Sequence, residues 1–161
     1  MTYDVLAFVF LSVSALVIAG GLGKRVRWVS PRLLLAAVLL RIVGSTVRYE
    51  VLERFYGGVG DAKGYYGYGL RFAEKIWALD LSPLSYEAWF SGRWWGTHFM
   101  RNLSGMVVTV LGPSLRAEFL FFALLSFCGL LALTLAFHRN YPGPVAKRYA
   151  AFIWLWPSLW F

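Results

Sequence analysis

Long apolar runs separated by charged connectors organise the sequence. Residues 5–22 carry no charge, and residues 117–137 form a second long apolar run. As helices rising about 1.5 Å per residue, both runs would cross most of a hydrocarbon core about 30 Å thick. A further span is predicted over 33–48, which Arg41 interrupts, and another over 149–161. The pattern therefore predicts an all-α integral membrane protein, a single membrane domain with about four transmembrane helices.

The segment from residue 49 to about residue 116 has a different pattern. Acidic and basic residues alternate there, glycine and aromatic residues cluster, and no window is long enough to cross a bilayer. Within it, residues 61–79 have a helical pattern that three glycines weaken. Residues 97–114 are apolar only from Leu103 to Leu111, which is too short for an ordinary span and predicts an interfacial or re-entrant helix. We therefore expect one long external loop that contains short interfacial helices.

Composition and charge placement support a membrane protein and orient it. The chain is 59% hydrophobic and 15% charged, with a net charge of +8. Its basic residues bracket apolar runs and no base-reading motif is present, so we expect membrane lipid as a partner and no nucleic acid. The connectors 24–32 and 139–148 contain seven Lys or Arg and no acid. The positive-inside rule places both connectors in the cytoplasm, and the long loop and the N-terminus outside.

The two ends of the chain carry separate signals. The first apolar run has its positive charges after it and not before it, so we interpret it as a retained span and not as a signal peptide. The last apolar run stops at Phe161 without a polar flank. We therefore expect the chain to be the amino-terminal part of a longer membrane protein, incomplete at its C-terminus.

One carboxylate stands out in the stretch 57-GGVGDAKGYYGYG-69. Asp61 opens the predicted helix, which suits an N-cap, but a carboxylate there is also available for catalysis or metal binding. Tyr65, Tyr66 and Tyr68 follow at spacings that put at least one ring on its helical face. Aromatic rings beside an acid suit a sugar, although tyrosines also populate any membrane interface.

Three further residues are candidates for binding. His98 and Arg101 are three residues apart, so they share a helical face, and the arginine suits a lipid phosphate, although both residues also fit a plain interfacial role. Arg41 lies within a span, where a charge is costly and usually faces protein or a water-filled cavity. It could pair with Glu50 or Glu53, face a phosphate, or be purely structural. No paired acids, HExxH, nucleophile elbow or P-loop is present, so the residues alone name no reaction.

Two segments carry a resemblance to a known enzyme class. The segment 60-GDAKGYYGYG-69 is similar to the GDA-x-x-Y pattern of bacterial GT-C glycosyltransferases, multi-span enzymes that use polyprenyl-phosphate sugars. The run 96-GTHFMRNLSGMVVTVLGPS-114, followed by 157-PSLWF-161, is similar to one bacterial set of such proteins. Two features depart from the class. Asp61 is alone where many members carry two acids, and the loop follows the second span instead of the first.

The resemblance implies sugar transfer from a polyprenyl-phosphate-linked donor at the extracytoplasmic face of the bacterial inner membrane. Asp61 would act as general base on the acceptor hydroxyl or help to hold a divalent cation, Mg²⁺ or Mn²⁺. Arg101 and Arg41 would bind the donor phosphate. Because a divalent ion normally takes several oxygen ligands, no metal-binding residue is assigned. The alternative is a non-catalytic membrane subunit or a transporter-like protein that binds glycolipid or partner helices.

Overall fold

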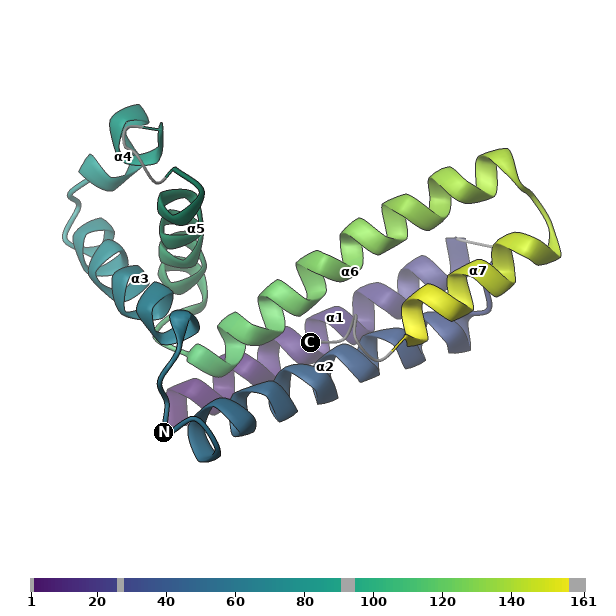
Figure 1. Ribbon diagram of the computed structural model, residues 1–161, viewed down its shortest axis with the longest axis horizontal. Helices are drawn as coiled ribbons and strands as arrows, with labels where there is room; N and C mark the ends of the chain where they lie inside the picture. Colours follow the sequence, from purple (N-terminus) through teal and green to yellow (C-terminus); the bar gives the residue numbers. More distant parts are fainter. Residues whose placement is uncertain (1, 26–27, 91–94, 157–161) are drawn as a thin grey trace. The chain divides into compact units, whose positions relative to one another are not determined.

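The computed structural model describes residues 2–25, 28–90 and 95–156, and all regular structure in these ranges is helical (Figure 1). The expected all-α class is therefore confirmed for the described part of the chain. In chain order, the α-helices and the 3-10 helix η1 are α1 Thr2–Arg25, α2 Pro31–Arg54, α3 Asp61–Trp77, η1 Ser82–Leu84, α4 Tyr86–Phe90, α5 Trp95–Leu111, α6 Leu115–Asn140 and α7 Pro144–Leu155.

Among the described helices, α1 and α6 are long and apolar enough to cross a membrane. They coincide with the predicted spans 5–22 and 117–137. The third candidate, α2, is 24 residues long, but it carries several charged side chains, Arg41 among them. For the fourth, 149–161, α7 covers the first part, and residues 157–161 lie outside the described residues. The four-span arrangement therefore stays a prediction.

The helices form two compact units. Unit 1 comprises Met1–Phe8 and Tyr49–Glu118, and unit 2 comprises Val9–Arg48 and Phe119–Phe161. Helices α1, α2 and α6 each contribute residues to both units. The long loop expected from the sequence thus falls in unit 1, together with the start of the chain.

Unit 2 has an apolar core to which four helices contribute. Its buried members come from α1, the α1–α2 connector, α2, α6 and α7: Ala19, Val29, Leu34, Ala37, Val38, Phe127, Ala150 and Trp154. On α2 the buried positions recur every three or four residues, which is the spacing of one helical face. Arg41 lies on that same face, so a cation is part of the buried stripe.

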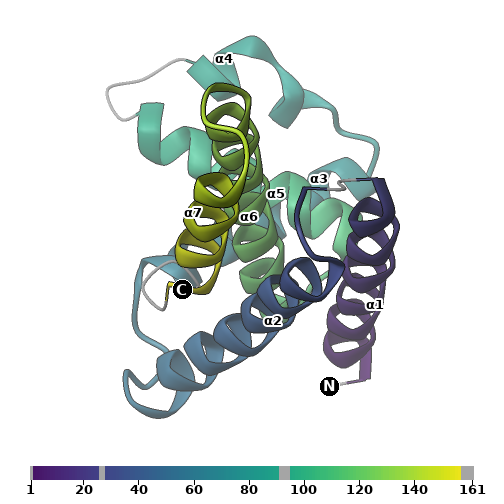
Figure 2. The same ribbon diagram turned by 90° about the vertical axis from the view of Figure 1, so that its right-hand side faces the viewer.

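Two aromatic stacks bring the connectors of unit 2 together. The ring of Trp28, which follows α1, lies 4.3 Å from the ring of His138 at the end of α6, with the planes 7° apart. Phe137 stacks on Tyr149 of α7 with ring centroids 4.0 Å apart. The α1–α2 and α6–α7 connectors therefore lie at the same end of unit 2, as both views show (Figures 1 and 2).

In unit 1, glycines allow α3 and α5 to approach closely. A Cβ on Gly105 of α5 would lie 2.4 Å from the ring of Phe72 on α3. A Cβ on Gly69 of α3 would lie 2.8 Å from the Ser104 hydroxyl oxygen. Small residues at both places remove the side-chain bulk that would otherwise separate the helices. The glycines that weaken α3 as an isolated helix thus include one that its packing needs.

Candidate functional site

Asp61 is the first residue of α3 and is exposed. The N-cap position belongs to Gly60, and no side chain makes a cap hydrogen bond there, so the capping interpretation of Asp61 was wrong. Its negative charge in the first turn still interacts favourably with the helix dipole. Within the described ranges, no ion pair or hydrogen bond occupies its carboxylate. This carboxylate is therefore free to meet a ligand.

The glycines before Asp61 form the turn that joins α2 to α3. Gly57 and Gly58 have φ angles of +57° and +73°, in the left-handed region where a side chain is strained. Lys63, which lies close to Asp61 in the sequence, pairs instead with Glu53 at 2.8 Å. The flexible composition of this stretch thus builds a tight turn and leaves the acid unpaired.

Tyr65 and Tyr66 are half-buried on α3. The Tyr65 carbonyl oxygen lies 3.1 Å from the Ser104 hydroxyl of α5. Burial raises the pKa of the Tyr66 hydroxyl above its ordinary value, and the negative charge of Asp4 raises it further. At neutral pH, Tyr66 therefore keeps its proton and can donate a hydrogen bond but cannot act as a base.

A pair of arginines lies against Tyr68 of α3. The guanidinium carbon of Arg101 on α5 is 5.6 Å from the Tyr68 ring centroid, and that of Arg71 is 5.9 Å away. Neither arginine forms an ion pair with any described residue. Two guanidinium groups near one ring, without acidic partners, can bind an oxyanion through charge-assisted hydrogen bonds. His98 lies one turn before Arg101 on α5, as the spacing predicts, and its side chain is half-buried.

Arg41 belongs to unit 2 and is fully buried. Its Nη1 donates a hydrogen bond to the Trp154 carbonyl oxygen at 2.6 Å, and its guanidinium carbon is 4.8 Å from the Phe127 ring centroid. Trp154 lies in the last turn of α7, where the helix leaves carbonyl groups unpaired, so Arg41 stabilises that helix end. Nε and Nη2 have no partner within the described residues.

Of the three alternatives for Arg41, a pairing with Glu50 or Glu53 is wrong. Glu50 pairs with Arg54 at 2.8 Å, and Glu53 pairs with Lys63. Because every acid in the chain lies in unit 1, the unit that holds Arg41 has no carboxylate of its own.

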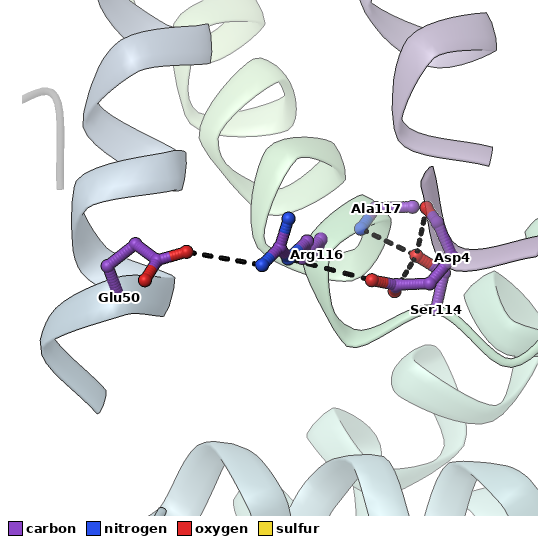
Figure 3. Close-up of polar contacts among 5 residues, drawn as sticks. All are labelled: Asp4, Glu50, Ser114, Arg116 and Ala117. Carbon is purple, nitrogen blue, oxygen red and sulfur yellow. Dashed lines mark hydrogen bonds and ion pairs between the residues drawn. The ribbon is translucent and has the colours of Figure 1, made fainter. Parts of the chain in front are cut away.

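A polar cluster that the sequence did not indicate joins three helices of unit 1 (Figure 3). Arg116 lies between two carboxylates, with Nη2 3.2 Å from Glu50 Oε1 and Nε 3.6 Å from Asp4 Oδ2. The Ser114 hydroxyl donates to Asp4 Oδ1 at 2.6 Å and accepts from the Ala117 backbone N–H at 3.1 Å. Ser114 therefore caps α6 and also holds the start of α1. A serine directly before an apolar run could have been recognised from the sequence as a helix cap. Its contact with Asp4, far away in the chain, could not have been recognised.

Next to this cluster lies a buried carboxylate. Glu118 is 5% exposed, and its Oε1 is 2.5 Å from the Ser104 hydroxyl oxygen, which is also 3.1 Å from the Tyr65 carbonyl oxygen. A serine hydroxyl has one hydrogen and cannot donate to both acceptors. Both contacts become hydrogen bonds only when Glu118 carries a proton and donates it to Ser104. The sequence offered no signal for this group beyond a glutamate at the start of an apolar run.

Metal binding finds no support in the described part of the chain. No group of three or more His, Cys, Asp or Glu side chains that could hold a metal ion occurs there. Asp61 alone offers too few oxygen ligands for Mg²⁺ or Mn²⁺. Of the residues predicted for the site, Asp61, Tyr65 and Tyr66 share α3, His98 and Arg101 share α5, and Arg41 lies in the other unit.

The described geometry thus offers a carboxylate without an ion-pair partner at the start of α3, and two guanidinium groups close to the Tyr68 ring. No protein-family model, no curated protein and no solved structure matches this chain.

Proposed function

We propose that this chain acts in a membrane glycosyltransferase that moves a sugar from a polyprenyl-phosphate donor on the extracytoplasmic face of the bacterial inner membrane. The observation that carries the proposal is the exposed carboxylate of Asp61, which forms no ion pair or hydrogen bond with a described side chain. Arg101 and Arg71, both close to the Tyr68 ring, supply cationic groups that form no ion pair with a described residue. Such a transfer needs two things from the protein: a base for the acceptor hydroxyl and cationic groups for the donor phosphate.

The proposed arrangement has α1, α2, α6 and α7 as spans, with unit 1 and the N-terminus outside. Charge supports it. All eight Asp and Glu lie in unit 1, whereas of the sixteen Lys and Arg seven lie in unit 1 and nine in unit 2. The contacts of Asp4 with Ser114 and Arg116 also tie the start of the chain to the unit that holds the long loop. Cationic connectors stay in the cytoplasm, which leaves the acid-rich unit outside.

In the proposed reaction, Asp61 accepts the proton of the acceptor hydroxyl as its oxygen attacks the anomeric carbon of the donor sugar. The bond between that carbon and the phosphate oxygen breaks, and the polyprenyl phosphate leaves with the electron pair. Arg101 and Arg71 balance the charge of the leaving phosphate. Tyr65 and Tyr66 hold the sugar, Tyr66 as a hydrogen-bond donor, and His98 lines the phosphate side.

The test is Asp61→Asn, which keeps the shape of the side chain and removes the base. Because a positioned general base contributes about 10²- to 10⁴-fold, we expect at least a 100-fold loss of sugar transfer. The assay follows radiolabelled sugar from a panel of polyprenyl-phosphate donors in membranes that contain the full protein. The control is Glu74→Gln, another exposed acid of α3, which should change transfer less than twofold. Normal transfer by Asp61→Asn, with helicity and insertion preserved, would refute the proposal.

A second candidate is a non-catalytic membrane subunit that binds partner helices. Arg41 favours it, because a buried guanidinium with unpaired nitrogens, in a unit without acids, is suited to a carboxylate from another helix. The same assay separates the two functions. If the catalytic residues lie in a partner of this subunit, Asp61→Asn leaves sugar transfer unchanged.

A further inference from the structure

We propose that the connector end of unit 2 binds the headgroups of anionic phospholipids. This connector end comprises Trp28, Arg32, His138, Arg139, Lys147 and Arg148. The inference goes beyond sugar transfer and does not depend on Asp61, which belongs to the other unit.

The tertiary structure assembles this surface from two connectors that are about 110 residues apart in the chain. Trp28 of the α1–α2 connector stacks on His138 in the last turn of α6, with ring centroids 4.3 Å apart. Arg32 lies in the first turn of α2, and Lys147 lies early in α7. The Phe137–Tyr149 stack holds the middle of α7 against the end of α6. Basic groups from three helices therefore gather at one end of unit 2.

No acidic residue of unit 2 balances the positive charge of this surface. Arg32, Arg139, Lys147 and Arg148 are exposed, and none forms an ion pair with a described residue. Unit 2 contains no Asp or Glu. Because the cations repel one another and have no internal acid to balance them, an external anion binds here with a net gain.

The surroundings identify a lipid, and not a soluble anion, as the source of that charge. The α1 segment within unit 2 leaves large apolar side chains exposed, including Phe10 at 69%, Val17 at 69% and Ile18 at 60%. A soluble phosphate gains nothing from such a surface, whereas the acyl chains of a phospholipid cover it. Trp28 and the exposed Tyr141 have the amphipathic rings typical of headgroup depth. A phospholipid would place its phosphodiester group at the basic residues and its acyl chains along the exposed apolar side chains.

The experiment titrates phosphatidylglycerol or phosphatidylcholine into the full chain in uncharged detergent and counts bound lipid by native mass spectrometry. We expect phosphatidylglycerol to bind at least tenfold more tightly than the zwitterionic lipid. The variant Arg139→Gln with Lys147→Gln should weaken phosphatidylglycerol binding about 30-fold, because each basic residue near an anionic surface contributes about fivefold. Phosphatidylcholine binding should not change.

Two controls make the result specific. Arg54→Gln with Lys75→Gln removes the same charge from exposed positions of unit 1 and should change phosphatidylglycerol binding less than twofold. The charge-keeping pair Arg139→Lys with Lys147→Arg should restore most of the affinity. Equal binding of the two lipids, or an equal loss in the unit 1 control, would overturn the proposal. Displacement of the lipid by excess inorganic phosphate would overturn it too, because the site would then bind a free anion.

Discussion

Two ionisable side chains, Arg41 and Glu118, are almost fully removed from solvent and are held in different ways. Arg41 keeps its charge, since arginine is not deprotonated in proteins, and places it against a helix-end carbonyl and the face of Phe127. Glu118 instead meets a hydroxyl that already faces a second acceptor, which favours the neutral carboxylic acid. The buried cation is thus stabilised by a carbonyl dipole and an aromatic ring, and the buried acid by its contact with the Ser104 hydroxyl.

The contact between Glu118 and the shared Ser104 hydroxyl leads to a prediction. Glu118→Gln keeps the size of the side chain and offers an N–H donor to Ser104, so the free energy of unfolding should change by less than about 0.5 kcal/mol. Glu118→Ala removes the donor and the packing together and should cost about 1–3 kcal/mol. Thermal unfolding in detergent, followed by circular dichroism, compares the two variants. A large loss with Gln would mean that the group is ionised and accepts its hydrogen bond.

At the scale of single residues, the sequence located the candidate side chains better than it identified their partners. Asp61 at a helix start and His98 one turn before Arg101 were predicted from spacing alone. The partners of Arg41 were not, because the carbonyl of Trp154 is 113 residues away in the chain. A side chain's type and local helix are local properties, whereas its hydrogen-bond partner depends on how distant helices pack.

At the scale of secondary structure, α3 and α5 ended close to where their patterns predicted. The helix expected over 61–79 runs from Asp61 to Trp77, and Leu79 has a φ of 64°, which a continuing helix would not allow. The segment expected over 97–114 forms α5, Trp95–Leu111. Whether α5 is interfacial or re-entrant stays a prediction. Its contact with α3 through Gly105 required the tertiary structure, because a glycine in a helix pattern by itself indicates only weakness.

The α3–α5 contact leads to a prediction at the element scale. Gly105→Ala places a Cβ 2.4 Å from the Phe72 ring, so one of the two helices must shift. We expect a loss of about 1–3 kcal/mol in the free energy of unfolding. The matched control is Gly67→Ala within α3, where a Cβ meets nothing within 4 Å. That change should be neutral or should stabilise the protein by up to about 1 kcal/mol through helix propensity. Thermal unfolding in detergent measures the stability of both variants. Equal changes in the free energy of unfolding would contradict the packing argument.

At the scale of the whole molecule, charge is divided between the two units. The acids occupy unit 1 without exception, and unit 2 has only basic residues among its charged groups. In the proposed membrane arrangement, the basic connectors would be retained on the cytoplasmic side. The adjacency of the two basic connectors, through Trp28 and His138, agrees with a common side for both.

The orientation is testable by labelling. In a Cys128→Ser background, Glu74→Cys reports on unit 1 and Val145→Cys reports on the α6–α7 connector; both positions are exposed. A membrane-impermeant maleimide added to intact cells should label position 74 and should reach position 145 only after the membrane is opened. Labelling of both positions from the outside would contradict the proposed topology, and with it an extracytoplasmic Asp61.

The sequence by itself determined the helical class, the two long apolar helices α1 and α6, and the basic character of the connectors. These are local properties, because apolar length and charge spacing can be read within one segment. Only the tertiary structure decided that Asp4 meets Ser114 across 110 residues, and that Trp28 stacks on His138. A buried polar group or an aromatic face takes its partner from whichever helix packs beside it. The separation of two residues along the chain does not indicate whether their helices pack together.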